Sequence, residues 1–313
     1  MKVLITGITG MVGSEFYRQF LARGADVAGV ARSSASSRME AVQDSRILRC
    51  DITDRDALEG VFRRVRPDVV VHMAAQAFNG MSWDCEYLTH CTNYLGTLNV
   101  LKCALKNGSD TRVLLACSSA EYGDFDPADC PLVEERMLRP VTPYGVAKAG
   151  TEMLGYQYFS NTGLPVYFPR MFIHVGTGHP PATAIQNFAR QIALIQKGLL
   201  EPVIRVGNLS TARDFIDVRD GVSAMITLLE KGTPGVPVNI CTGRAYKISE
   251  VLEMLLNISG ITAEVREDPA LLRASDEPLL LGENSRILSL GWEQRYTLYE
   301  TLEGVYRDWL GRC

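Results

Sequence analysis

The sequence predicts an α/β protein: a Rossmann-type doubly wound parallel sheet followed by a smaller C-terminal α/β lobe. Short apolar, β-branched runs alternate with segments of helical period through the first half of the chain, as in sheets covered by helices on both faces. A glycine-rich loop directly follows the first of these runs. The chain has 313 residues, 46% of them hydrophobic, which is enough for one large core and a second lobe.

The alternation sets the expected elements. Buried parallel strands are expected at residues 3–6, 26–30, 46–50, 68–72, 113–118 and 166–170, with helices at 13–23, 55–65, 87–106 and 144–162. After about residue 170 we expect helices at 187–197, 249–256 and 298–310 and short strands at 202–206 and 236–241. We therefore divide the chain into a domain of residues 1–170 and a lobe of residues 171–313, and the chain can cross between them.

Composition excludes several classes of function. The net charge is −4 and no stretch is strongly basic, so a nucleic-acid partner is not expected. The eight cysteines form no Cys-x-x-Cys pair, which argues against zinc, any other metal site or a disulfide framework and favours a reducing cytoplasm. No apolar run approaches the roughly 20 residues that a membrane span needs.

A loop of three glycines opens the first helix. Gly7, Gly10 and Gly13 directly follow the first strand, with Met11 and Val12 at the start of the helix. Glycines at such a turn let the backbone approach a pyrophosphate, which rests on the helix N-terminus. Glycines are common in ordinary turns, but their place between a strand and a helix makes these five residues predicted contacts of a dinucleotide cofactor.

The end of the second strand indicates which dinucleotide binds. An NAD site usually has Asp or Glu there, whereas this chain has Arg32, Ser33 and Ser34. A guanidinium and two hydroxyl groups suit a 2′-phosphate, so NADP(H) is expected rather than NAD(H), unless Arg32 is a solvated loop charge. Asp51 and Ile52 follow the third strand and are predicted adenine contacts, although Asp51 also fits as the N-cap of the next helix.

Three residues form a predicted catalytic group. Tyr144 and Lys148 lie one turn apart on one face of a helix. The ammonium is expected to favour the phenolate and lower the pKa of Tyr144, which suits proton transfer to or from a sugar hydroxyl or ketone. Ser118 ends the fifth strand, at the edge where parallel sheets bind ligands. Each residue alone has an ordinary interpretation, as a surface helix or a cap, but together they predict catalysis.

Beyond the glycine loop, further stretches form a recognisable set: residues 74–76 (AAQ), 118–123 (SSAEYG), 139–145 (RPVTPYG), 187–192 (NFARQI), 206–209 (VGNL), 213–220 (RDFIDVRD) and 279–282 (LLLG). Together they resemble the extended short-chain dehydrogenase/reductase family, which acts on nucleotide sugars. The resemblance covers essentially the whole chain. It is nearest to the branch that contains GDP-mannose 4,6-dehydratase and GDP-4-keto-6-deoxymannose reductase.

This resemblance implies roles for the predicted residues. Ser118 would hydrogen-bond the reacting sugar oxygen, Tyr144 would be the acid/base and Lys148 would hold the nicotinamide ribose. Ala74 and Ala75 would contact the cofactor. The N-terminal domain would then bind NADP(H), and the C-terminal lobe would bind the nucleotide sugar.

The resemblance also implies substrate contacts. Arg213 corresponds to an arginine that clamps the diphosphate, for which a bidentate guanidinium is suited. Arg273 and Asp276 correspond to an Arg and Glu pair that grips diphosphate and ribose, with a shorter carboxylate here. Structural salt bridges are the alternative for both arginines. The other implied substrate contacts are Gln76, Ser119, Asn187, Arg190 and Val206.

Two departures from the family pattern bear on the reaction. Dehydratases have a Glu, the base that removes a sugar proton, where this chain has Ala120. The adjacent Glu121 is expected to point elsewhere on an extended backbone, as a structural or solvent-facing charge. Ile173 replaces an Asn that usually holds the diphosphate or sugar, and the neighbouring His174 is either a substrate contact or structural.

These observations leave four functions in order of preference. A C4 ketoreductase of a GDP-4-keto-6-deoxyhexose, of the kind that makes GDP-rhamnose, comes first, and a nucleotide-sugar C4 epimerase is the alternative. A GDP-mannose 4,6-dehydratase is disfavoured by Ala120. A non-catalytic NADP(H) sensor would not need the Ser118, Tyr144 and Lys148 set. Apolar residues on the helices at 87–106 and 144–162, which pair in family members, indicate a homodimer or homotetramer.

Overall fold

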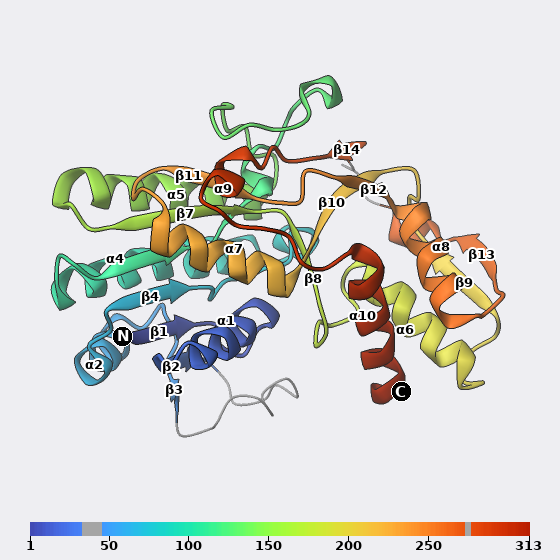
Figure 1. Ribbon diagram of the computed structural model, residues 1–313, viewed down its shortest axis with the longest axis horizontal. Coiled ribbons are helices and arrows are strands. Elements are labelled where there is room, and N and C mark those ends of the chain that lie inside the picture. Colours follow the sequence, from blue (N-terminus) through green and yellow to red (C-terminus); the bar gives the residue numbers. More distant parts are fainter. Residues whose placement is uncertain (33–45, 273–276) are drawn as a thin grey trace.

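The computed structural model describes residues 1–32, 46–272 and 277–313. Figure 1 shows two lobes, with the N-terminus in the larger and the C-terminus in the smaller. The strands of the larger lobe are β1 (Lys2–Thr6), β2 (Asp26–Ala31), β3 (Ile47–Arg49), β4 (Val69–His72), β5 (Arg112–Leu115), β6 (Cys117–Ser118), β7 (Val166–Met171) and β11 (Pro237–Ile240). Its helices are α1 (Met11–Ala22), α2 (Arg55–Val65), α3 (Glu86–His90), α4 (Gly96–Asn107), α5 (Pro143–Thr162), α7 (Val218–Lys231) and α9 (Ser285–Ser289).

The large sheet is parallel throughout its described strands. Their order is β11-β7-β5-β4-β1-β2-β3, with β6 also beside β7. Every residue of β4 is buried, and so are the last four residues of β1, as expected for strands covered on both faces. The predicted Rossmann-type sheet is therefore confirmed.

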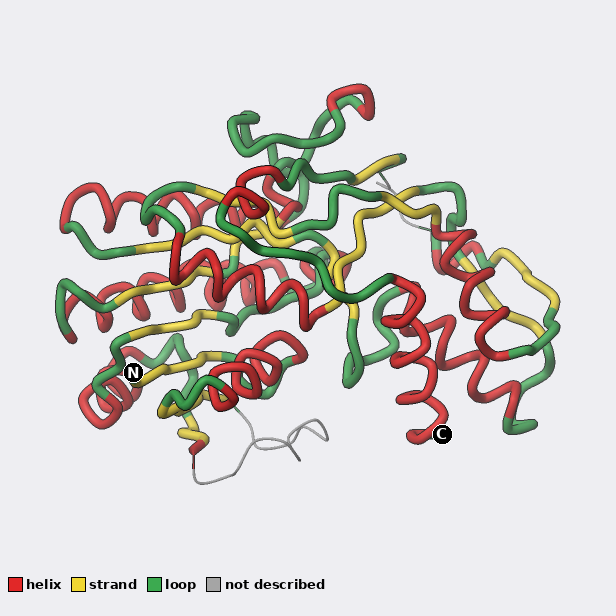
Figure 2. Tube along the Cα trace, in the orientation of Figure 1, coloured by secondary structure: helices red, strands yellow, loops and turns green. Residues whose placement is uncertain are grey.

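Helices cover both faces of this sheet (Figure 2). Successive side chains of a strand point to opposite faces, so one strand supplies two cores. Val3 and Ile5 of β1 pack in the cluster that holds α1 and α7. Leu4, between them, packs in the cluster that holds α2, α4 and α5.

The smaller lobe has its own core. Its elements are β8 (Ile173–Val175), α6 (Ala184–Gln196), β9 (Val203–Val206), β10 (Ala212–Asp217), β12 (Ala245–Lys247), α8 (Ile248–Ser259), β13 (Glu264–Glu267), β14 (Leu279–Leu280) and α10 (Leu298–Arg312). β10 lies between β12 and β14 and also pairs with β8, while β9 pairs with β13. Phe188, Leu252 and Leu302 bring α6, α8 and α10 together.

The chain crosses between the lobes after residue 170. β11 pairs with β7 in the large sheet, and α7 packs against α1. The strand expected at 236–241 therefore belongs to the larger lobe in space. The helix α7 was not among the expected elements. Local sequence pattern predicts that a strand forms but not which sheet it joins, and the division at residue 170 stays a prediction.

Two expected elements are interrupted. The helix expected at 87–106 consists of α3, a π-helical turn η4 (Cys91–Leu95) and α4. The strand expected at 113–118 is split into β5 and β6. Both interruptions lie at the carboxyl edge of the sheet, where the site residues are. None of the described helices has the length and apolar character that crossing a membrane requires.

Candidate active site

The glycine loop packs too tightly for larger residues. Gly7 has a φ of +71°, and a Cβ there would lie 2.7 Å from the Ala74 nitrogen. A Cβ on Gly13 would lie 2.2 Å from the Gly7 carbonyl oxygen. Gly10 is the N-cap of α1 and has no side chain to occupy the first N–H groups, so this end of the helix suits an anion. Met11 and Val12 form its first turn.

Arg32 and Asp51 lie near each other beside this loop. Thr53 donates hydrogen bonds to Asp51 from its backbone N–H, at 2.9 Å, and from its hydroxyl, at 2.8 Å. The backbone bond is the main cause that lowers the pKa of Asp51, and the charge of Arg32 adds to it. Arg32 is exposed. Ser33 and Ser34 lie outside the described residues.

The alternative role of Asp51 is wrong. The N-cap of α2 is Asp54, whose carboxylate accepts from the Ala57 N–H at 3.0 Å. Asp51 therefore does not cap α2, and its predicted contact with the adenine stays a prediction. The Ile52 side chain is buried against Gly96 of α4, and its carbonyl oxygen accepts from the Asn99 side chain at 3.0 Å. An adenine contact by the Ile52 side chain is therefore not supported.

Tyr144 and Lys148 lie in the first turns of α5. Thr142 caps this helix by accepting from the Gly145 N–H at 3.0 Å. Lys148 is buried, and its Nζ donates to the Ala116 carbonyl oxygen at 2.6 Å. Its Nζ lies 5.8 Å from the centre of the Tyr144 ring. α5 packs against β6, which ends at the buried Ser118, so the three predicted catalytic residues come from contacting elements.

Ser118 begins a tight turn, the 3₁₀ helix η5 (Ser119–Glu121). Its Oγ accepts from the Ala120 N–H at 3.2 Å, and its own N–H donates to Glu121 Oε1 at 2.7 Å. Because Oγ is used as an acceptor, its proton remains free to point at a substrate oxygen. Ser119 is buried in the same turn.

The expectation for Glu121 needs correction. It is fully buried, so the solvent-facing interpretation is wrong, and the backbone there is helical rather than extended. Its carboxyl group turns back under Ser118, towards Arg170, whose Nε lies 3.9 Å from Glu121 Oε2. Glu121 therefore does not supply the carboxylate that Ala120 lacks.

A chain of buried hydrogen bonds, which sequence reasoning missed, joins the loop to α4. Thr6 Oγ1 lies 2.7 Å from His72 Nδ1, and His72 Nε2 lies 2.9 Å from Thr97 Oγ1. Thr97 donates its proton to the Asn93 carbonyl oxygen, so we infer that His72 is protonated on Nε2 and accepts at Nδ1. Burial, and then the charge of Lys148, lowers the pKa of His72 to about 3, so its ring is neutral.

Asn93 is the second residue that sequence reasoning missed. Its Oδ1 accepts from the Gln76 N–H at 2.8 Å, and its Nδ2 donates to the Gln76 carbonyl oxygen at 3.0 Å. Thr151, one turn after Lys148, donates to the Asn93 carbonyl oxygen at 3.1 Å. Asn93 thus ties residues 74–76 to α5. An amide inside an apolar helix was the available signal, and the π-helical turn around it is common at functional sites.

The smaller lobe holds a cavity of about 280 Å³. Of the predicted substrate residues, Asn187 and Arg213 line it, and Ile173 lines it as well. Arg190 and Val206 are not among its lining residues, since Val206 is buried and the following glycine faces the cavity instead. Arg273 and Asp276 lie outside the described residues. Gln76 and Ser119 belong to the larger lobe.

Arg213 is held from one side by carbonyl groups. Its Nη1 donates to the carbonyl oxygens of Ala212, at 2.9 Å, and Glu277, at 2.5 Å. The Glu277 carboxylate lies 3.7 Å from Nη2. The side chain is about 10% exposed, towards the cavity wall that it helps to form. The structural ion pair that was the alternative for Arg213 is therefore present, and the clamp on the diphosphate stays a prediction.

The cavity adjoins the cofactor loop. A Cβ on Gly176 would lie 3.3 Å from the Met11 sulfur, at the start of α1. The ring of His179, on the cavity wall, meets the ring of Phe78 edge-on with centres 5.6 Å apart. The phosphate end of the first lobe and the cavity of the second are therefore neighbours. That is the arrangement needed to bring a cofactor and a sugar together.

His174 packs between the lobes. Its Nδ1 lies 2.9 Å from the Phe172 carbonyl oxygen, and Nε2 has no hydrogen-bond partner among the described residues. A Cβ on Gly221 would lie 2.1 Å from Nε2, so α7 leaves room only for glycine there. Burial lowers the pKa of His174 to about 4. The packing against α7 agrees with the structural interpretation, and His174 also lines the cavity, so the substrate contact stays a prediction.

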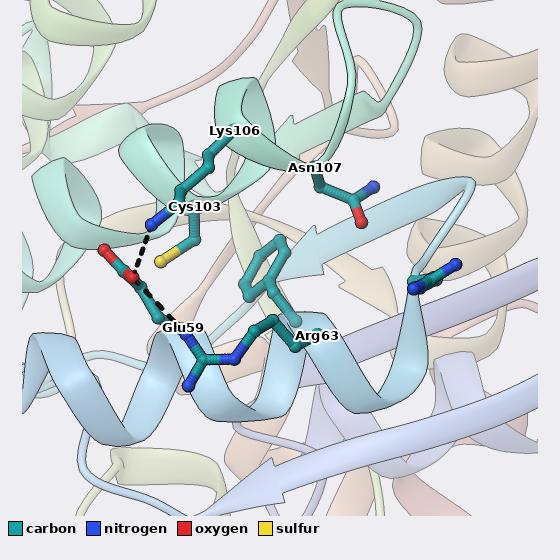
Figure 3. Close-up of a pocket in the computed structure, with 7 residues that line it drawn as sticks. Glu59, Arg63, Cys103, Lys106 and Asn107 are labelled. Carbon is teal, nitrogen blue, oxygen red and sulfur yellow. Dashed lines mark hydrogen bonds and ion pairs between the residues drawn. The ribbon is translucent and has the colours of Figure 1, made fainter.

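A second hollow, of about 270 Å³, lies between α2 and α4 (Figure 3). Glu59 there is bound by Lys106 at 2.7 Å and Arg63 at 3.7 Å, all on the surface. Burial is the main cause that raises the pKa of Cys103 to about 11, which makes its thiol a poor nucleophile. No predicted site residue lines this hollow, and it is remote from the carboxyl edge of the sheet.

Comparison with known proteins agrees with this arrangement. A model of the family described as GDP-mannose 4,6 dehydratase matches residues 4–305. The GDP-6-deoxy-D-mannose reductase of Pseudomonas aeruginosa is 33% identical over 265 residues, which cover 84% of this chain and 87% of that protein.

Solved structures match as well. The structure of RMD from Pseudomonas aeruginosa complexed with NADPH superposes with a TM-score of 0.88 at 29% identity, over 100% of this chain and 99% of that one. The UDP-glucose 4-epimerase of Thermotoga maritima, solved with UDP-glucose, gives 0.91 at 26% identity, over 100% and 99% of the two chains. The chain therefore belongs to the GDP-mannose 4,6-dehydratase family, among the nucleotide-sugar dehydratases, reductases and epimerases of the extended short-chain dehydrogenase/reductase type.

Proposed function

We propose that this protein is an NADPH-dependent C4 ketoreductase of a GDP-4-keto-6-deoxyhexose. The observation that carries the proposal is the turn after Ser118, where Ala120 takes the place of a base and Glu121 is buried away from the substrate side. Reduction at C4 needs an acid and a donor to the sugar oxygen, which Tyr144 and Ser118 supply. It needs no carboxylate base.

Three residues of the chain have separate roles in the proposed reaction. Lys148, fixed by the Ala116 carbonyl oxygen, places its positive charge beside the Tyr144 ring. Tyr144 gives its proton to the C4 oxygen of the sugar as negative charge develops there. Ser118 donates a hydrogen bond from its hydroxyl group to the same oxygen and stabilises that charge. When bound, NADPH supplies the hydride.

The preference for NADP(H) over NAD(H) is part of the proposal. Arg32 ends the second strand in place of an acidic residue and is exposed. A guanidinium at this position is suited to a 2′-phosphate. The reductase of Pseudomonas aeruginosa was solved with NADPH, whereas the UDP-glucose 4-epimerase of Thermus thermophilus was solved with NAD.

The sugar nucleotide is proposed to lie in the cavity of the smaller lobe. Arg213 would contact its diphosphate, and Asn187 would contact it from α6. We retain Arg190 and Val206 as contacts only for a nucleotide that extends beyond the cavity. Ile173 offers no hydrogen bond at the wall, so the diphosphate must be held mainly from the Arg213 side.

A nucleotide-sugar C4 epimerase is the second candidate, because the same three catalytic residues serve both reactions and an epimerase superposes well on the chain. The two are separated by two incubations, one of the protein with GDP-4-keto-6-deoxymannose and NADPH, and one of the protein with a nucleotide sugar that carries a C4 hydroxyl group. We expect consumption of one NADPH for each reduced sugar. Interconversion of sugar epimers without net NADPH consumption would instead establish the epimerase.

We further propose a homodimer or homotetramer of a cytoplasmic protein. Apolar side chains on the outer faces of α3 and α5 are exposed, including Tyr87 at 84%, Met153 at 62% and Tyr156 at 53%. A contiguous apolar face of this kind marks an interaction site. Size-exclusion chromatography with light scattering tests it: Met153→Glu should shift the assembly towards the monomer, and an unchanged mass would contradict the interface.

A further inference from the structure

A buried cluster of titratable groups lies directly behind Ser118. It contains Cys117 of β6, Glu121 of η5, Glu152 of α5 and Arg170 of β7, each less than a tenth exposed. The ligand atoms of Cys117, Glu121 and Glu152 lie within 4.8 Å of one another. No part of the reaction proposed above uses these groups, so their arrangement needs its own explanation.

Arg170 is committed to Glu152. Its Nε donates to Glu152 Oε2 at 2.9 Å and its Nη2 to Oε1 at 2.6 Å, a bidentate pair. Its Nη1 donates to the Tyr122 hydroxyl at 3.1 Å and the Glu134 carbonyl oxygen at 2.8 Å. Glu152 and Arg170 thus neutralise each other, and Arg170 Nε lies 3.9 Å from Glu121 Oε2, beyond hydrogen-bond distance.

Glu121 therefore faces an already balanced pair. Its Oε1 accepts from the Ser118 N–H at 2.7 Å, and its Oε2 has no hydrogen-bond partner among the described residues. A second negative charge here would exceed the single positive charge of Arg170 and would be wholly buried, which is very costly. One proton on Oε2 removes that charge. A divalent metal ion would instead have to displace Arg170 from both oxygens of Glu152.

We propose that Glu121 is a positioning residue for Ser118: it is a neutral carboxylic acid whose Oε1 holds the Ser118 N–H, while Glu152 carries the charge that Arg170 balances. Two hydrogen bonds hold the turn: the Ser118 N–H donates to Glu121 Oε1, and the Ala120 N–H donates to Ser118 Oγ. Together they fix the direction of the serine hydroxyl. The kinetic part of this proposal rests on the reductase function, and the protonation part does not.

The protonation state has a sign that can be tested. Burial, and then the charge of Glu152, raises the pKa of Glu121 well above its ordinary value of 4.5. The folded state then binds a proton that the unfolded state releases, so this group's contribution to stability falls as pH rises above 4.5. The charged or titratable groups that face Glu121 are Cys117, Glu152 and Arg170. Substitution of Glu121 alone isolates its contribution to the pH dependence of stability.

The experiment compares one substitution at the two carboxyl groups. Glu121→Gln keeps the acceptor and replaces the O–H by N–H, so we expect kcat and NADPH affinity within about threefold of wild type. Because the amide does not titrate, we also expect the melting temperature of the variant, relative to that of wild type, to rise between about pH 5 and about pH 8. Glu152→Gln leaves Arg170 without its counter-charge, so we expect its melting temperature to fall by about 6–10 °C. Equal losses in the two variants would overturn the proposal.

Two further measurements complete the test. The infrared carbonyl band of a buried protonated carboxylic acid should be present in wild type at neutral pH and absent in Glu121→Gln. Its absence from wild type would refute the neutral acid whatever the protein's activity. Glu121→Leu removes the acceptor, so we expect kcat to fall about 10²-fold with NADPH affinity unchanged. An unchanged kcat in a folded Glu121→Leu variant would refute the positioning role.

Discussion

The two lobes hold their functional residues in different ways. In the larger lobe, backbone atoms form the site: Gly7 approaches Ala74, and Gly13 approaches Gly7, at distances that admit no side chain. In the smaller lobe, side chains from β8, α6 and β10 converge on one cavity, and Arg213 is directed by carbonyl groups from two segments. The three glycines of the backbone site are close neighbours in sequence, whereas the side-chain site depends on packing between distant segments.

This difference predicts separable effects. Substitutions in the larger lobe should change kcat or cofactor affinity, and substitutions in the smaller lobe should change the KM for the sugar nucleotide. The first variant, with the largest expected effect, is Tyr144→Phe, which removes the acid and should lower kcat about 10³-fold. Its NADPH dissociation constant should stay at the wild-type value. Tyr156→Phe, on the exposed side of the same helix, is the control and should leave kcat unchanged.

The second variant tests the cavity. Arg213→Ala should raise the KM for the sugar nucleotide about 10²-fold, and Arg213→Lys, which keeps the charge but loses the fork of donors, about 10-fold. Steady-state kinetics at saturating NADPH measure both. A parallel loss of NADPH affinity would show that the lobes are not separable in this way.

The third variant tests the cofactor preference. Arg32→Ala should weaken NADPH binding about 10-fold and leave NADH binding unchanged, because only NADPH carries the 2′-phosphate. Arg23→Ala makes the same change of charge at the exposed end of α1 and should have no effect on either cofactor. Fluorescence titration measures the affinities, and equal weakening of both cofactors by Arg32→Ala would contradict the assignment.

The fourth variant has the smallest expected effect and changes a residue of the larger lobe that contacts the smaller one. Phe78 belongs to the larger lobe, but its ring contacts His179 on the cavity wall. Phe78→Leu should therefore raise the sugar-nucleotide KM about threefold, as expected for the loss of one edge-on aromatic contact. A change in NADPH affinity alone would place Phe78 with the cofactor instead.

The sequence predicted the parts of the site that adjacent residues determine. The glycine loop, the pair Tyr144 and Lys148, and Ser118 could all be predicted because each lies at a recognisable junction of strand and helix. His72 and Asn93 were missed, since their hydrogen-bond partners are distant in sequence. A buried polar residue reveals its role only when its partners are known.

Glu121 and β11 show two further limits of sequence reasoning. The orientation of Glu121 was argued from an extended strand, but the chain turns immediately after Ser118, and the side chain is fully buried rather than solvent-facing. The strand β11 was correctly expected as a strand but returns to the large sheet, beside β7. The local sequence pattern predicts a strand but does not determine with which sheet that strand pairs.

The central claim is that this chain reduces C4 of a GDP-linked 4-keto sugar with NADPH. Its most direct test uses NADPH carrying deuterium at the transferred position, mixed with GDP-4-keto-6-deoxymannose, with the product examined by mass spectrometry and NMR. The account predicts one deuterium per product molecule, on C4 of the sugar, and almost none with Tyr144→Phe. Conversion of the sugar without deuterium at C4 would contradict it.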